Sequence, residues 1–281
     1  KATATLTSSS TVETASVCAE APHGAGVPEA QYKVCTNVNF VGAAPAAPID
    51  LTASPSGWSN NNDFTVSWSN PTDPFGIVGA YYKLDSVPNS ATDGSYVAGS
   101  GITSISGIAV AGNGPHQIYV WLKDGAGNVD HNNLAWTVLY YDITVPAAPV
   151  ISSATHPVEG TWYSNNDPSF TWTTPTDIAG IGGYSYALDK VSNTTPDTTV
   201  DSTGNSLSYT DLGGGSWYFH VRAKDSAGNW GDADHYLVNI GTPPVAANDA
   251  YSTNEDTVLN VSAPGVLGND SDGVGEQLSA L

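Results

Sequence analysis

Apolar and polar residues alternate with a period of two in several short segments of the chain. The alternation is clearest in residues 64–68, 80–84 and 118–123, and this period is the pattern of β-strands with one buried face. Turn-forming Asn, Gly and Pro residues separate the segments, and no twelve-residue window shows a helical stripe free of Gly or Pro. The pattern therefore predicts an all-β protein.

The chain also repeats itself. Matched tryptophans recur at an offset of 104 residues, pairing Trp58 with Trp162 and Trp68 with Trp172. Further on the offset falls to 101, which indicates a short loop difference inside the repeat. We therefore predict two homologous units, 46–145 and 146–242, each introduced by a Pro-rich segment. About seven short strands in about 100 residues is typical of an immunoglobulin-like or fibronectin-like sandwich.

Each unit contains the pattern Y-x-L-D, at 82–85 and 186–189, and later K-D-x-A-G-N, at 123–128 and 224–229. These motifs resemble the bacterial immunoglobulin-like repeats of large surface proteins. The D-x-A-G-N segments predict tight hairpins, in which Gly supplies positive φ and Asp or Asn bonds nearby backbone. One acid per loop is too few for a calcium site of six to eight oxygens. The turn residues are Asp124, Gly127, Asn128, Asp225, Gly228 and Asn229.

Four of the tryptophans have matched positions in the two units. Trp68 and Trp172 lie in the middle of predicted strands, so we expect them in the core of each sandwich. Trp58 and Trp162 precede polar loops, where two functions stay open: packing between domains or stacking on sugar rings.

Residues 243–281 are similar to the opening half of cadherin-like repeats in very large bacterial adhesins. The similarity rests on Asp249, Glu255–Thr257 and Gly265–Asp272, and it implies an incomplete third β unit. Hard oxygen ligands near a linker are what calcium needs, although Val274 stands where the family continues with acids. A structural calcium site and a solvated acidic loop are both open for the acids Asp249, Glu255, Asp270, Asp272 and Glu276.

Composition narrows the partners and the compartment. The formal net charge is −20, from 27 acids and 7 bases, which argues against nucleic acid and anionic membranes as partners. No apolar run approaches the roughly 18 residues of a membrane span. The low Lys content and the high content of Ser, Thr and Asn are typical of an exported protein, so we expect an extracellular or cell-surface location.

No catalytic motif stands out, and the six histidines share no repeat position. We therefore expect a non-catalytic structural segment of a surface protein without an obligatory cofactor: a stalk, adhesin or filament subunit. The arm 1–45 and the tail 243–281 suggest head-to-tail association of copies by strand addition. The alternative is a set of carbohydrate-binding or spacer modules of a secreted polysaccharide-degrading enzyme.

The Ser/Thr-rich arm 1–45 contains both cysteines, Cys18 and Cys35. No partner with metal-ligand spacing accompanies them, so we predict a disulfide and an oxidising compartment. The bond would stabilise the arm by roughly 3 kcal/mol through loop closure. Mass spectrometry of the unreduced native protein should find no alkylatable thiol, and two alkylated cysteines would contradict the prediction.

Overall fold

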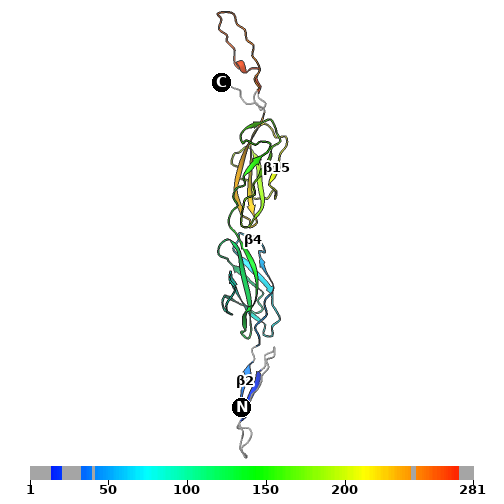
Figure 1. Cartoon of the computed structure of the whole chain (residues 1–281), viewed down its shortest axis with the longest axis vertical. Helices are drawn as coiled ribbons and strands as arrows, with labels where there is room; N and C mark the ends of the chain where they lie inside the picture. The colour runs from blue at the N-terminus through cyan, green and yellow to red at the C-terminus, as the bar shows by residue number, and fades with distance from the viewer. Residues whose placement is uncertain (1–13, 21–32, 40–41, 242–244, 272–281) are drawn as a thin grey trace, which may run out of the picture. The chain divides into compact units, whose positions relative to one another are not determined.

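The structure, a computed structural model, describes residues 14–20, 33–39, 42–241 and 245–271. The chain divides into two compact units, Lys1–Asp142 and Ile143–Leu281, each with its own β-sandwich (Figure 1). In the arm, β1 (Thr14–Glu20) pairs antiparallel with β2 (Lys33–Asn39), and Cys18 stands opposite Cys35 in their register. The side chains of this arm lie outside the described residues, so the disulfide stays a prediction.

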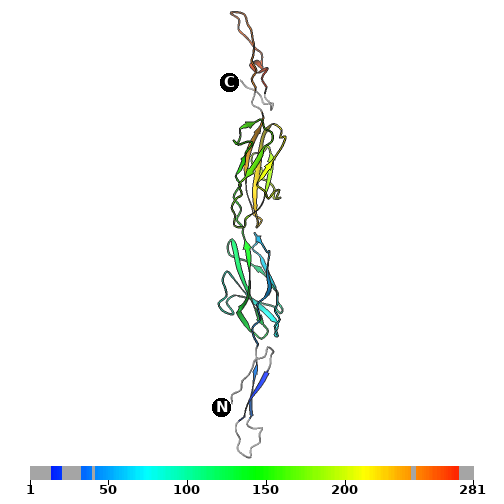
Figure 2. The same cartoon turned by 45° about the vertical axis from the view of Figure 1, so that its right-hand side comes forward.

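The first sandwich, drawn in blue to green in Figure 2, has two sheets. Their strand orders are β3-β5-β8 and β4-β10-β9-β6-β7. All neighbours pair antiparallel except β4 and β10, which run parallel. This is an immunoglobulin-like arrangement. The strands are β3 (Ile49–Ser54), β4 (Trp58–Ser59), β5 (Phe64–Ser69), β6 (Ile77–Leu84), β7 (Ser95–Ala98), β8 (Ser104–Ile108), β9 (Gly114–Asp124) and β10 (Val129–Tyr141).

The alternation of β5 shows how the sequence builds this sandwich. Phe64, Val66 and Trp68 are buried at 0%, 0% and 6% exposure, while the intervening Thr65 and Ser67 face away from the core. When one face of each sheet packs against the other, apolar surface is removed from water, which stabilises the fold by about 25 cal/mol for each Å² buried. The Trp68 Nε1–H, the one polar atom of that side chain, donates to Asn70 Oδ1 at 2.9 Å.

The second sandwich repeats the plan with sheets ordered β11-β13-β15 and β12-β17-β16-β14. Trp172 is 2% exposed and packs edge-on against Tyr184, with ring centroids 5.5 Å apart. At the place of β7 the second unit has a single bridge, Tyr184 to Ser202. The strands are β11 (Ile151–Ser153), β12 (Trp162–Tyr163), β13 (Ser169–Trp172), β14 (Ile181–Asp189), β15 (Ser206–Ser208), β16 (Gly215–Asp225) and β17 (Trp230–Ile240).

Between residues 245 and 271 the tail does not form the strands that its resemblance to cadherin-like repeats implies. Its described residues, 245–271, contain one antiparallel bridge, Val245 to Ser271, and the 3-10 helix η2 (Gly265–Leu267). Glu255–Thr257 correspond to a strand in the cadherin-like repeats that the tail resembles, and this expected strand is wrong, because the Thr257 N–H donates to the Asn254 carbonyl in a turn. The physical reason is that half a sandwich offers no second sheet to cover its apolar side chains, and Val258 is accordingly 80% exposed.

Replacing Trp68 by Ala should destabilise the first unit by about 3 to 5 kcal/mol, because a large buried side chain would leave a cavity. Urea unfolding of the full chain measures this change. The control is Trp136→Ala, since Trp136 is 57% exposed and its loss should cost less than about 1 kcal/mol. Equal effects of the two substitutions would contradict the strand phase assigned to β5.

Candidate functional site

A buried aspartate holds the last hairpin turn of each unit. The Asp124 carboxylate accepts the backbone N–H and the side-chain amide of Asn128, both at 2.7 Å. Asp225 does the same for Asn229, at 2.8 and 2.7 Å. Both aspartates are at most 1% exposed. The glycines before these asparagines have positive φ, 95° at Gly127 and 107° at Gly228.

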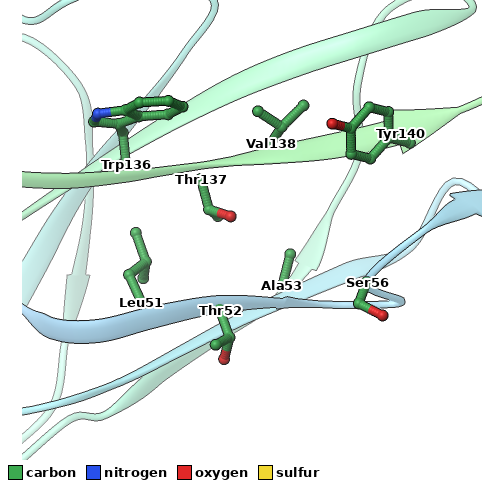
Figure 3. A pocket seen from close by; sticks show the side chains of 8 residues that line it. All are labelled: Leu51, Thr52, Ala53, Ser56, Trp136, Thr137, Val138 and Tyr140. Atoms are coloured by element: carbon green, nitrogen blue, oxygen red, sulfur yellow. The ribbon is translucent and has the colours of Figure 1, made fainter.

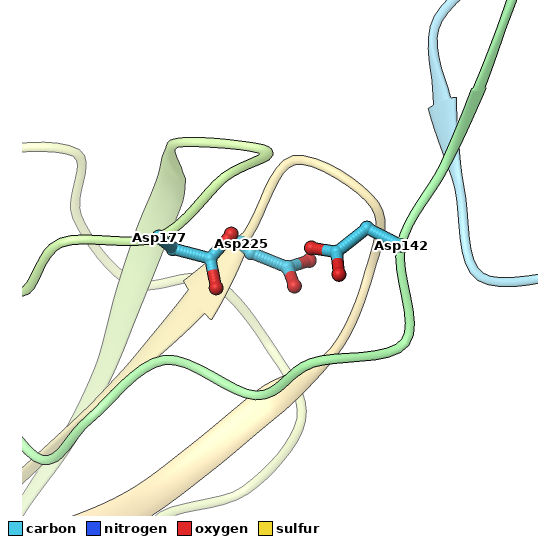
Figure 4. A group of neighbouring side chains, drawn as sticks. All are labelled: Asp142, Asp177 and Asp225. Carbon is cyan, nitrogen blue, oxygen red and sulfur yellow. The ribbon is translucent and has the colours of Figure 1, made fainter. Parts of the chain in front are cut away.

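A second aspartate caps another turn in each unit. Asp73 Oδ1 accepts the Phe75 N–H at 2.9 Å, and Asp177 Oδ1 accepts the Ala179 N–H at 2.8 Å. Figure 4 draws Asp177 and Asp225, both of the second unit, together with Asp142, the last residue of the first unit. A folding role follows for the four aspartates that are matched between the units, Asp73, Asp124, Asp177 and Asp225, because each one accepts a backbone N–H of its own turn.

The outer face of the larger sheet in the first unit carries stacked aromatic side chains. Tyr81 lies between Tyr96 and Trp121 in register, with ring centroids 4.7 and 5.5 Å away. Trp121 belongs to this outer face yet is fully buried, and its Nε1–H donates to the Ala91 carbonyl at 2.8 Å. The connection between β6 and β7 thus covers part of the outer face.

A groove of about 370 Å³ opens between β3 and β10 of the first unit (Figure 3). Trp136, Val138 and Tyr140 follow one another at two-residue intervals on one face of β10, and the Trp58 ring lies 5.2 Å from that of Tyr140. An adjoining hollow of about 320 Å³ shares Val138 and Tyr140. The groove is lined by Leu51, Thr52, Ala53, Ser56, Trp136, Thr137, Val138 and Tyr140, none of them charged.

Two histidines and an aspartate are linked in the second unit. His220 is fully buried; its Nδ1 lies 2.7 Å from His235 Nδ1, and its Nε2 lies 3.3 Å from Asp189 Oδ1. Burial lowers the pKa of His220, and the hydrogen bond to Asp189 only partly opposes this. Hydrogen bonds donated by Thr194 and Val191 lower the pKa of Asp189. This cluster therefore favours a neutral His220 beside an ionised carboxylate.

The acids predicted to bind calcium are only partly within the described residues. Asp270 Oδ1 accepts the Ala247 N–H at 2.7 Å, and Asp249 Oδ1 accepts the Tyr251 hydroxyl at 3.2 Å. Asp249, Glu255 and Asp270 do not gather into a three-ligand group within residues 245–271. Asp272 and Glu276 lie outside the described residues. A calcium site of all five acids stays a prediction.

The chain is similar in sequence to parts of two larger bacterial proteins. The chain is 30% identical to chitinase A1 of Niallia circulans over 235 residues. This alignment covers 79% of this chain and 30% of that protein. It is also 30% identical over 164 residues to endoglucanase B of Cellulomonas fimi, covering 54% of this chain and 15% of that protein. The chain thus spans less than a third of the length of these relatives. No protein-family model matches it.

Similar solved structures include the FN1–FN3 domains of chicken CNTN1, at 16% identity and a TM-score of 0.33, covering 73% of this chain and 71% of that one. The fibronectin(III)-like modules of CbhA from Clostridium thermocellum match at 12% identity and a TM-score of 0.30, covering 70% and 90%. In the described part of the chain, no helix is long and apolar enough to cross a membrane.

Acidification should destabilise the second unit through His220. The pKa of His220 in the folded chain lies below the ordinary value of 6.5. As the pH falls through 6.5, the unfolded chain therefore binds more protons than the folded chain, and the free energy of unfolding decreases. Hydrogen exchange of β16 peptides, corrected for intrinsic rates, should show more opening at pH 5 than at pH 7.5.

The His220→Tyr variant, which places there the residue that the first unit has at Tyr119, should flatten this dependence. His131→Gln in the first unit is the control and should leave it unchanged. A dependence that persists in His220→Tyr would assign the effect to another group.

Proposed function

We propose that the two sandwiches are accessory, non-catalytic modules of an extracellular protein that degrades polysaccharides. The observation that carries this proposal is the match of more than half of this chain to minor parts of two proteins named as a chitinase and an endoglucanase. Such modules set the distance and direction between a catalytic domain and its insoluble substrate. In this proposal, the catalytic domain is a separate part of the same natural protein.

Contacts at the start of each unit support a spacer that resists bending. In the first unit the Asn133 side-chain amide donates to the Pro45 carbonyl at 2.8 Å. In the second, Gly231 approaches Pro146 so closely that a Cβ there would lie 2.3 Å from the Pro146 carbonyl oxygen. Pro-rich segments are stiff in themselves, and these contacts hold each of them against the sandwich that it introduces.

A stalk of a surface protein would use the same mechanical property. The accessory role is favoured because both relatives carry the names of polysaccharide hydrolases. Association with copies of the chain through its arm and tail is a separate proposal, and much of those segments lies outside the described residues.

Deleting residues 46–242 from the natural protein should lower its hydrolysis of insoluble chitin or cellulose several-fold and leave hydrolysis of soluble oligosaccharides unchanged. Reducing-sugar assays measure both, and the 281-residue chain alone should release no sugar. The control replaces the deleted region with a Gly/Ser linker of equal length, which should restore little activity because it is flexible. A natural protein that hydrolyses no polysaccharide would overturn the proposal.

A further inference from the structure

We infer that the groove between β3 and β10 of the first unit binds an uncharged polysaccharide chain, with Trp136 stacking on a sugar ring. This inference rests on the proposed function and deepens it, because it assigns a glycan contact to one unit and none to the same place in the other. The second unit has the same fold and therefore serves as an internal comparison.

The place that matches the groove is closed in the second unit. There the Glu159 carboxylate accepts the Leu237 N–H at 3.0 Å, and the Gly160 N–H donates to the Leu237 carbonyl at 3.2 Å. The Asn239 side-chain amide donates to the Gly160 carbonyl at 2.6 Å. In the first unit the corresponding positions are Ser56, Val138 and Tyr140, and all three line the open groove.

The difference has a cause in the sequence. Nine residues separate Pro48 from Trp58, whereas twelve separate Pro149 from Trp162. The three additional residues lengthen the segment that lies along β17 in the second unit. The shorter segment of the first unit leaves the corresponding part of β10 uncovered, which produces the groove.

The fold does not require a tryptophan at position 136. Trp136 stands opposite Tyr119 in register, and the matching pair in the second unit is His235 opposite His220. Trp136 nevertheless exposes 57% of its surface. A large aromatic side chain held at the rim of an open groove, where it adds nothing to the core, is a feature of binding surfaces.

The lining selects the chemistry of the ligand. A sugar ring has an apolar face, which suits Trp136, and a rim of hydroxyls, which suits the hydroxyls of Thr52 and Thr137. The volume of about 370 Å³ is within the range of small-molecule sites. Asp85 is the charged residue of the adjoining hollow, and the net charge is −20, so polyanions would be repelled.

The two hollows together favour a chain over a single sugar. They share Val138 and Tyr140, and Trp136 and Tyr140 are separated by about 13 Å along an extended strand. A peptide strand added to the edge of β10 is less favoured as the occupant. Part of that edge is already paired, because Tyr140 and Tyr141 of β10 stand in register with Trp58 and Ser59 of β4.

Calorimetric titration of the full chain with cellohexaose and chitohexaose tests the inference, with polygalacturonate as the anionic probe. At least one neutral hexasaccharide should bind, and Trp136→Ala should weaken that binding about tenfold. The matched control is Tyr96→Ala, which removes another exposed aromatic side chain (41%) of the same unit and should leave the affinity unchanged. Circular-dichroism melting checks that both variants stay folded.

A second variant tests the geometry independently. Replacing residues 54–57 with the sequence of residues 155–161 should close the groove and abolish binding. Absence of binding to both hexasaccharides at millimolar concentration would overturn the inference, as would equal binding of polygalacturonate. So would self-association that Trp136→Ala abolishes without any glycan binding, which would assign the edge to a second copy. The accessory role would survive these failures, because a spacer needs no affinity of its own.

Discussion

Burial of two sheet faces against each other is the constraint on which both units depend. Because side chains of a strand alternate between its two faces, each strand gives one face to the core and leaves the other for different uses. The inner faces of the two units share a buried tryptophan at matched positions, Trp68 and Trp172, at 6% and 2% exposure. The outer faces and open edges differ, and these are where the units can differ in function.

The fold could be predicted from the sequence because its signals are local. Alternation in segments such as 64–68 and the D-x-A-G-N turns depend on neighbouring residues, so the all-β sandwich follows from them. The burial of Trp121 could not be predicted in this way, since it depends on a connection that folds over the outer face. The tail was predicted by resemblance to strands of a complete domain, and those strands do not form between residues 245 and 271.

The candidate site could not be predicted from local sequence patterns either, because it too depends on contacts between distant segments. The change of repeat offset found in the sequence lies after the matched tryptophans, in another loop, and does not indicate that the longer segment before Trp162, through Glu159 and Gly160, bonds β17. Trp136 has no matching tryptophan in the second unit and stood out in no motif. Its proposed binding role depends on the groove beside it, which forms only when β3 and β10 are brought together from distant parts of the chain.

An amide-resolved NMR titration of the full chain with the hexasaccharide that binds would test the central claim most directly. The claim is that two sandwiches of one fold differ in function because the groove is open in the first unit and the matching place is closed in the second. The account predicts shifts concentrated in β3 and β10 around Leu51 and Trp136, with the amides of β11 and β17 unchanged. Equal shifts in both units, or shifts confined to the second unit, would contradict it.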